Sequence, residues 1–352
     1  MSFLDFEDLN MIPFTRILEH LTLTDMFLAS FTNENAHNIL EDLFVRTFIS
    51  IQAFDGKFDL KVKSPGPRAT LCFTTQKTIC DLPEGERKMV LHIRGHKIEM
   101  TLMHGLNQKV KYIHVEKKYV PLMLTVVFDY IRDLFGTTDF NICVSLNKMR
   151  RYLRDMDVLC MTIVDKKISA GSLERLLTRI RVHEHLRLLA KVTGSLPENS
   201  AIHNISQLHT QGTWMKFKHI MRFNGEHALF DRNRFTEENI VDFIAHFLLG
   251  GFPNLQTVIM RSKNRLDYKK VTQHVASRPW DPTQRARHFM YTPEISSVMN
   301  DQHLRQLTDC TYGFDIVCGH GRLATFQITS NHFVFFVWTD PFPWRHMLVD
   351  HH

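Results

Sequence analysis

Histidines are the residues of this chain with the widest chemical range, because an imidazole can bind a metal, transfer a proton or form hydrogen bonds. The chain has 21 of them in 352 residues. His183 and His185 flank Glu184, and His203 and His209 follow in the next stretch of the chain. A zinc site requires convergent ligands, usually at a recognisable pair of spacings, and these residues do not show one. We therefore expect surface histidines here and no metal site.

Cysteines offer a second possible chemistry. Cys310 and Cys318 lie close in sequence to the cations His320 and Arg322, and a cysteine reacts as the thiolate that such cations stabilise. The sequence supplies no further group of a mechanism, so we expect structural cysteines. All six cysteines are far apart with no C-x-x-C pair, which is typical of reduced thiols in the cytoplasm or nucleus.

Motifs of the common enzyme classes do not occur in the sequence. We find no G-x-x-x-x-G-K-S/T, no G-x-G-x-x-G after a strand, no G-x-S-x-G and no H-E-x-x-H. The carboxylates fall at helix starts and expected surface positions rather than as an acid–base pair. We expect no enzymatic activity, no catalytic residues and no cofactor.

Composition and charge are those of an ordinary globular protein, with 44% hydrophobic and 23% charged residues and a net charge of +6. A basic chain can bind nucleic acid or an acidic membrane. Here the positive charge is spread among 37 acidic residues, so nucleic-acid binding is supported by charge alone. The densest basic cluster is expected to be a solvated helix face; it consists of Lys148, Arg150, Arg151 and Arg154.

Targeting and membrane segments are not apparent in the sequence. The first ten residues lack the basic and apolar regions of a secretory signal. No apolar stretch approaches the roughly 20 residues of a membrane helix. We expect a soluble protein of the cytoplasm or nucleus with no membrane partner.

Three short helices are predicted before residue 47. An apolar stripe at i, i+3, i+4 and i+7 runs from Phe14 to Leu21. Thr22 or Thr24 is expected to cap the second helix, with Asp25 near its positive end. Helices this short bury little surface alone, so they either dock on a partner or pack on the sheet of the same fold.

Strands are predicted next. Phe58, Leu60 and Val62 alternate with polar residues, and segments containing Pro and Gly indicate loops. We expect a small antiparallel sheet that joins the two halves of the chain.

Helices and strands then alternate over residues 121–266. Ser169 and Thr236 are each expected to cap a helix, and the second helix should end at Gly250 before a strand over 255–260. The recurrence of one helix–strand unit predicts a parallel sheet in a leucine-rich-repeat-like solenoid. The other expected elements are helices over 124–135, 149–156, 173–180 and 214–221, and strands over 140–146, 158–164, 185–192 and 227–230.

Two further features complete the pattern. A C-terminal hairpin, with strands over 323–328 and 332–338, is expected to close the open sheet edge. By analogy with other solenoids, polar residues of the parallel strands would form a target-binding surface. They include Asn141, Ser145, Thr162 and Arg187.

Four segments, taken in order, resemble one protein family. They are LNMIPFTRILEHLTLTDMFLASFTNENAHNIL (9–40), WMKFKHIMRFNGEHALFDRNRFTEENIVDFIAHFLLGGFPNLQTVIM (214–260), Arg278-Pro279-Trp280-Asp281 with Asp315-Ile316 and Gly321-x-x-Ala324-Thr325, and Phe335-x-x-Trp338. The chain resembles the nematode proteins that join an F-box to an F-box-associated domain of the second type, the F-box B family.

Pattern and resemblance together predict an α+β fold. An N-terminal three-helix F-box-like module (1–46) and a β-rich connecting segment (47–120) would precede a leucine-rich-repeat-like α/β solenoid closed by a C-terminal β-hairpin. The repeated region (121–266) and the loop and hairpin (267–352) would together form the F-box-associated domain.

The resemblance also implies a function. The chain would be the substrate-recognition adaptor of a Skp–cullin–F-box-type ubiquitin ligase. Its N-terminal helices would bind a Skp-family adaptor and through it a cullin, and its α/β domain would bind an unknown protein substrate. The residues at the family's adaptor-contact positions are Leu9, Ile12, Phe14, Ile17, Leu18, Leu21 and Met26.

Several positions depart from the F-box pattern. Asn10 and Leu23 stand where the family has Pro, Pro13 stands where it has an aliphatic residue, and residues 33–35 reverse its usual positive charge. These departures leave open a second function, in which a degenerate F-box protein acts as a protein-interaction scaffold without ligase recruitment.

Overall fold

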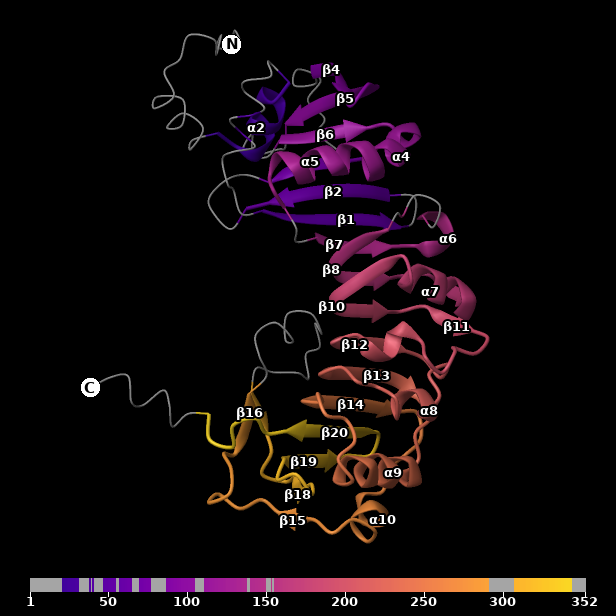
Figure 1. Ribbon diagram of the computed structural model, residues 1–352, viewed down its shortest axis with the longest axis vertical. Helices are drawn as coiled ribbons and strands as arrows, with labels where there is room; N and C mark the ends of the chain where they lie inside the picture. The colour runs from indigo at the N-terminus through magenta and orange to yellow at the C-terminus, as the bar shows by residue number, and fades with distance from the viewer. Residues whose placement is uncertain are drawn as a thin grey trace, which may run out of the picture. The chain divides into compact units, whose positions relative to one another are not determined.

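The computed structural model describes residues 21–31, 38, 40, 47–54, 57–64, 70–76, 87–104, 111–137, 140–149, 153, 155–290 and 307–343. The chain divides into two compact units, Met1–Val164 (unit 1) and Asp165–His352 (unit 2). Figure 1 shows their elements, coloured by residue number from indigo to yellow.

Unit 1 is built on a mixed sheet. Its strands are β1 (Phe48–Phe54), β2 (Lys57–Lys63), β3 (Leu71–Thr74), β4 (Arg87–Ile93), β5 (His96–His104), β6 (Lys111–Val115), β7 (Phe140–Val144) and β8 (Met156–Ile163). They lie in the order β8-β7-β1-β2-β3-β6-β5-β4. The pairs β7–β8, β7–β1 and β3–β6 are parallel and the other neighbours are antiparallel. Burial alternates along β1 and β2, as expected of strands with one face on a core.

Helices cover this sheet in unit 1. They are α2 (Leu23–Ala29), the 3-10 turn η3 (Lys117–Tyr119), α4 (Val120–Leu122), the π-helical η4 (Met123–Val127), α5 (Phe128–Leu134) and α6 (Leu146–Met149). Thr22 is the N-cap of α2, and its Oγ1 accepts a hydrogen bond from the backbone N–H of Asp25 at 3.1 Å. Phe27 packs edge-to-face on Phe73 of β3, with ring centroids 5.1 Å apart. α2 is therefore part of the unit 1 core.

The strands of unit 2 also pair in a mixed pattern. Its strands are β10 (Ile180–Leu188), β12 (Gln207–Gln211), β13 (His227–Asn233), β14 (Thr257–Ser262), β15 (Arg278–Pro279), β18 (Phe314–Val317), β19 (Leu323–Ile328) and β20 (His332–Val337). They lie in the order β15-β18-β19-β20-β14-β13-β12-β10. β10 to β14 pair in parallel, whereas β20, β19, β18 and β15 continue the sheet in antiparallel pairs.

Smaller elements connect and cover the unit 2 sheet. They are β9 (Lys167–Ser169) paired with β11 (Lys191–Thr193), β16 (His288–Met290) paired with β17 (Leu307–Asp309), α7 (Ala170–Leu177), η5 (Ala201–Asn204), α8 (Phe217–Ile220), α9 (Glu237–Leu248) and α10 (Tyr268–Thr272). α9 begins with the predicted Thr236 cap, which forms a reciprocal capping box with Asn239. It ends where Gly250 adopts a φ of 89°, a conformation that costs glycine little.

The predicted fold class is wrong. Each unit is a large mixed sheet rather than a solenoid, because antiparallel strands continue the parallel ones: β2 pairs with β1, and β20 pairs with β14. The strands of the supposed repeat do pair in parallel, which explains why the alternation looked like a solenoid. A separate three-helix module is also wrong, since α2 packs on β3 as part of unit 1.

Local boundaries differ from the prediction at several points, among them Leu146, which begins α6 instead of ending a strand. Met156 begins β8 instead of ending a helix, and Ile180 begins β10. The C-terminal hairpin is formed by β19 and β20, as expected. Among the helices of the described residues, none has the length and apolar character needed to cross a membrane.

Candidate functional site

Four parallel strands of unit 2 carry one row of polar side chains. The registers align His185 of β10 with Gln207 of β12, then with His227 of β13, and finally with Thr257 of β14. The last three are the first residues of their strands. Aligned residues of neighbouring strands project to the same face of a sheet. We call these four residues the polar row.

The polar row lies on the sheet face opposite α9. Phe243 of α9 packs on Phe335 of β20, with ring centroids 5.3 Å apart. The next residue, Phe336, is paired with Thr257. Because successive residues of a strand point to opposite faces, Phe336 and Thr257 lie on the face away from the helix.

Gly225 allows β13 to begin in register with β12. The backbone N–H of His227 donates to the carbonyl of Ser206 at 2.9 Å, just before β12. A Cβ at Gly225 would collide with the carbonyl oxygen of Ile205. Only glycine permits that approach without a backbone shift, so Gly225 helps to place His227 beside β12.

The polar row is buried, yet each side chain has a hydrogen-bonding atom without a partner among the described residues. These atoms are His185 Nε2, Gln207 Oε1, His227 Nδ1 and Thr257 Oγ1. Leaving a buried polar group unpaired costs about 1–3 kcal/mol. Since most buried polar groups in folded proteins are paired, stability of the fold does not account for this row. It is a candidate binding site.

Burial keeps both imidazoles of the polar row neutral. Burial lowers the pKa of His227 to about 4. Burial, together with His209 and Arg187, lowers the pKa of His185 to about 3. A neutral imidazole has one donor and one acceptor nitrogen, and Arg187 adds a cation beside the row. The row can therefore both donate and accept hydrogen bonds, which suits the amide and carboxylate groups of a polypeptide.

Apolar side chains border the row on the same face. Leu229 and Ile259, two residues beyond His227 and Thr257, belong to a buried cluster with Phe289, Cys310, Phe336 and Trp338. Phe289 stacks on Phe336 with ring centroids 4.5 Å apart. The face thus changes from polar to apolar within two residues of the row.

A second pair of buried histidines lies between η5, which precedes β12, and α8, which precedes β13. His203 of η5 and His219 of α8 lie with Nε2 and Nδ1 3.3 Å apart and rings stacked at 5.4 Å. Burial, the facing His219 and Arg222 lower the pKa of His203 to about 4. Burial and the cations Lys218 and Arg222 also lower the pKa of His219. Both rings are neutral at physiological pH and form a packing contact.

The prediction that the histidines between residues 183 and 209 lie on the surface is wrong for three of the four. His183 is exposed, but His185, His203 and His209 are buried. Local sequence does not reveal this, because burial depends on strand pairing far along the chain. Within the described part of the chain, no three His, Cys, Asp or Glu side chains are placed to hold a metal ion.

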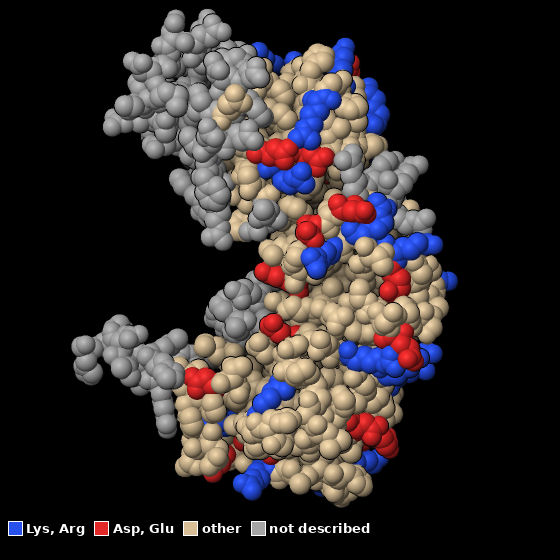
Figure 2. Space-filling view, viewed as in Figure 1, with Lys and Arg blue, Asp and Glu red and all other residues tan. Residues whose placement is uncertain are grey.

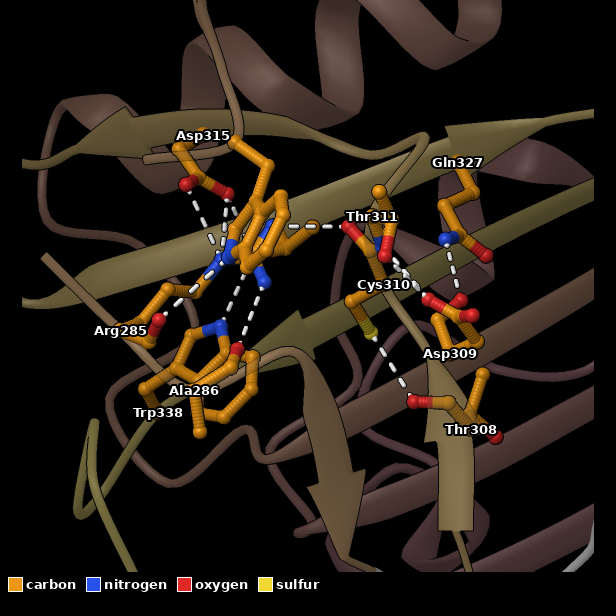
Figure 3. Close-up of polar contacts among 11 residues, drawn as sticks. Arg285, Ala286, Thr308, Asp309, Cys310, Thr311, Asp315, Gln327 and Trp338 are labelled. Carbon is orange, nitrogen blue, oxygen red and sulfur yellow. Dashed lines mark hydrogen bonds and ion pairs between the residues drawn. The ribbon is translucent and has the colours of Figure 1, made fainter. Parts of the chain in front are cut away.

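The C-terminal part of unit 2 contains a second polar cluster, drawn in Figure 3. Arg285 is 0% exposed, and its Nε donates to both carboxylate oxygens of Asp315 at 2.9 and 3.0 Å. Thr325 Oγ1 donates to the same carboxylate at 2.6 Å and accepts from Trp338 Nε1 at 2.8 Å. Arg285 also donates to the backbone carbonyl of Cys310 at 2.9 Å. We call Arg285, Asp315, Thr325 and Trp338 the arginine cluster.

Cys310 and Trp280, which lies in the Arg278–Asp281 segment, have structural roles beside the arginine cluster. Burial raises the pKa of the Cys310 thiol to about 12, so the thiolate needed for nucleophilic chemistry does not form near neutral pH. Trp280 Nε1 donates to the carbonyl of Arg285 at 3.3 Å. These residues hold the C-terminal strands together.

The residues predicted to bind a Skp-family adaptor are placed only in part. Leu21 is half-buried, and Met26 is 1% exposed inside α2. A partner would reach Met26 only after α2 moved from β3. The other predicted contact residues lie outside the described residues; they are Leu9, Ile12, Phe14, Ile17 and Leu18.

Sequence reasoning singled out His185, and Arg187 beside it, but not the other three residues of the polar row. Gln207, His227 and Thr257 share one detectable signal: each is a polar residue at the first position of a short strand and is followed by an apolar residue. Their alignment could not be inferred, because it depends on the register of three separate strand pairs.

Comparison with known sequences shows that part of unit 2 is similar to one sequence family. Residues 197–260, which include Gln207, His227 and Thr257, match the sequence family described as F-box associated. This is a protein-interaction type of domain. The predicted resemblance to a nematode F-box-associated protein is confirmed, and the matched segment contains three residues of the polar row.

Two relatives in Caenorhabditis elegans extend the comparison. Uncharacterized protein F59B2.8 is 25% identical over 210 residues, which cover 57% of this chain and 46% of the relative. Uncharacterized protein F59B2.9 is 20% identical over 177 residues, which cover 49% and 39% of the two chains. The matches thus span less than half of each relative. No solved structure matches this chain.

Proposed function

We propose that this chain is the substrate-recognition adaptor of a Skp–cullin–F-box-type ubiquitin ligase, without enzymatic activity of its own. The match of residues 197–260 to the F-box-associated family carries the proposal. Unit 2 would bind a protein target, and the N-terminal residues would bind a Skp-family adaptor that connects to a cullin.

The polar row is our candidate for target binding. Its unpaired atoms would gain hydrogen bonds from a polypeptide, which offsets part of the free energy that their burial costs. The row is buried in the free chain, so binding would be coupled to a local opening of unit 2. Arg187, at the side of the row, would favour a target segment that carries a carboxylate.

Adaptor binding is tested by pull-down of the purified full chain with a Skp-family protein. Wild-type chain should bind, and the double variant Ile17→Asp/Leu21→Asp should lose binding, because two charges would enter an apolar helical interface. A matched control places the same two charges on Leu249 and Tyr312, which are 86% and 88% exposed in unit 2. Absence of wild-type binding in a sample folded by circular dichroism would contradict ligase recruitment.

Target binding is tested separately by proximity labelling in cells. Gln207→Ala/His227→Ala should lose labelled proteins that the wild-type chain labels, while labelling of the Skp-family adaptor persists. Identical labelling by both chains would contradict a role of the polar row in target binding.

The scaffold alternative is favoured by one observation, the packing of α2 in the unit 1 core. Because the apolar residues of α2 pack on the sheet of unit 1, fewer of them are accessible to an adaptor. The scaffold predicts target labelling without adaptor binding, so the same two experiments distinguish the functions.

A further inference from the structure

A different part of the molecule, strand β4 in unit 1, has the features of a peptide-binding edge. β4 is the last strand of the unit 1 order, and among the described residues only β5 pairs with it. The unpaired side of such a strand presents backbone N–H and C=O groups that can form hydrogen bonds with another extended chain.

The register identifies which backbone groups face outward. β4 and β5 are joined by a two-residue turn, Arg94 and Gly95, with φ angles of 49° and 79°, as in a type I′ hairpin. Such a turn bonds the residues that flank it, Ile93 and His96, to each other. Hydrogen-bonded and non-bonded pairs alternate along an antiparallel ladder. Every second residue from Ile93 back therefore faces β5, and the outward groups belong to Lys88, Val90 and His92.

The hairpin is held in place by an acidic helix. Arg94 forms an ion pair with Asp133 of α5 and lies 4.0 Å from Asp129 of the same helix. Its neighbour Gly95 supplies the positive φ that the turn requires. The edge is thus fixed before a ligand arrives, which lowers the entropy cost of binding.

Side chains on one face of the hairpin add specificity. The register pairs Lys88 with Thr101, Val90 with Glu99, and His92 with Lys97, so all six share a face. A cavity of about 510 Å³ opens over this face, and its lining includes Lys88, Val90, Thr101, Met103 and His114. Val90 is 46% exposed, which leaves an apolar side chain at the centre of the edge.

Charge on this face is left for an acidic partner. On this face β4 carries Lys88, Val90 and His92, and the strand contains no acidic residue. Glu99 and Glu116, which also line the cavity, both pair with Lys118, at 3.8 and 2.9 Å. Figure 2 shows Lys and Arg side chains gathered over the end of unit 1 where β4 and β5 lie.

We propose that the free edge of β4 binds an extended acidic segment of a partner protein as an added strand. Residues of that segment opposite Lys88 and His92 are four positions apart, with the residue opposite Val90 midway between them. The geometry selects the pattern acidic–x–apolar–x–acidic. This surface is separate from the polar row of unit 2 and does not depend on the proposed ligase function.

The test measures fluorescence anisotropy of the labelled peptide Ser-Glu-Thr-Val-Thr-Glu-Ser with the full chain. Wild-type chain should bind, and Lys88→Glu should weaken binding by about tenfold. A peptide with Lys in place of both Glu residues should recover affinity for the Lys88→Glu chain and bind wild type poorly. Lys63→Glu, the same change at an exposed residue of β2, should leave affinity within about twofold.

A backbone variant tests strand addition itself. Val90→Pro removes an outward N–H, and proline is tolerated on an edge strand when that N–H faces solvent, so peptide binding should be lost while circular dichroism is unchanged. If the variant misfolds, the charge exchange above decides the proposal. Lack of wild-type binding at about 1 mM peptide, or retained binding by a folded Val90→Pro chain, would overturn it. A dimer by light scattering that Lys88→Glu dissociates would overturn it in favour of a second copy as the occupant.

Discussion

The polar row and the arginine cluster are both buried in unit 2, but they differ in whether their polar atoms form hydrogen bonds. In the arginine cluster, Asp315 receives hydrogen bonds from Arg285 and Thr325, and the indole of Trp338 completes the network. In the polar row, every side chain has an atom without a partner among the described residues. A satisfied network stabilises a fold, whereas an unsatisfied row destabilises it unless a ligand pairs with it. The contrast separates residues whose hydrogen bonds stabilise unit 2 from residues that we propose for recognition.

The largest expected effect comes from breaking the arginine cluster. Arg285→Met would leave the Asp315 carboxylate buried without its cation and should lower the free energy of unfolding by about 3–5 kcal/mol, measured by urea denaturation. Replacing the pair together, as Arg285→Met/Asp315→Leu, should recover most of that loss because no uncompensated charge remains. Equal destabilisation by the single and double variants would show that the ion pair is not what the cluster depends on.

A smaller effect is expected from pH in the polar row. Burial lowers the pKa of His227 from 6.5 to about 4, so the unfolded chain binds a proton more readily than the folded chain. Stability is therefore complete above about pH 6.5 and falls as the pH approaches 4, by on the order of 3 kcal/mol for this group. His227→Gln should flatten the curve over that window in urea titrations at several pH values. An unchanged slope would contradict a neutral buried imidazole at this position.

The smallest effect is expected at the exposed pair beside the arginine cluster. Arg287 Nη2 lies 2.7 Å from Asp309 Oδ2, with side chains 57% and 38% exposed. Solvent screens such pairs, so Arg287→Ala should leave the urea midpoint unchanged within error. A shift as large as that of Arg285→Met would mean that burial does not distinguish the two ion pairs.

Local features of the fold were predictable from the sequence and long-range ones were not. The caps at Ser169 and Thr236 were found, and the first cap was narrowed to Thr22 or Thr24, because a cap involves only residues three apart. The C-terminal hairpin was found for the same reason. The pairing of β14 with β20, which overturns the solenoid, joins segments about 75 residues apart in sequence, and no local pattern encodes it.

The candidate site was predictable only in fragments. His185 was noticed as a histidine with chemical potential, but its burial, and hence its neutral state, results from packing in the sheet. Thr257 is an ordinary threonine in sequence and becomes notable only because its buried hydroxyl has no partner in the described residues. The segment that carries the F-box-associated resemblance, residues 214–260, contains His227 and Thr257 but neither His185 nor Gln207.

Two threonines test the central distinction most directly. Thr257 and Thr325 are both 0% exposed, on β14 and β19 of the same sheet. Replacing each by valine and measuring the free energy of unfolding in urea compares one unpaired hydroxyl with one that bridges Asp315 and Trp338. The account predicts that Thr325→Val loses about 1–3 kcal/mol and that Thr257→Val is neutral or more stable than wild type. Equal destabilisation by both variants would contradict the claim that the polar row is available for binding rather than used by the fold.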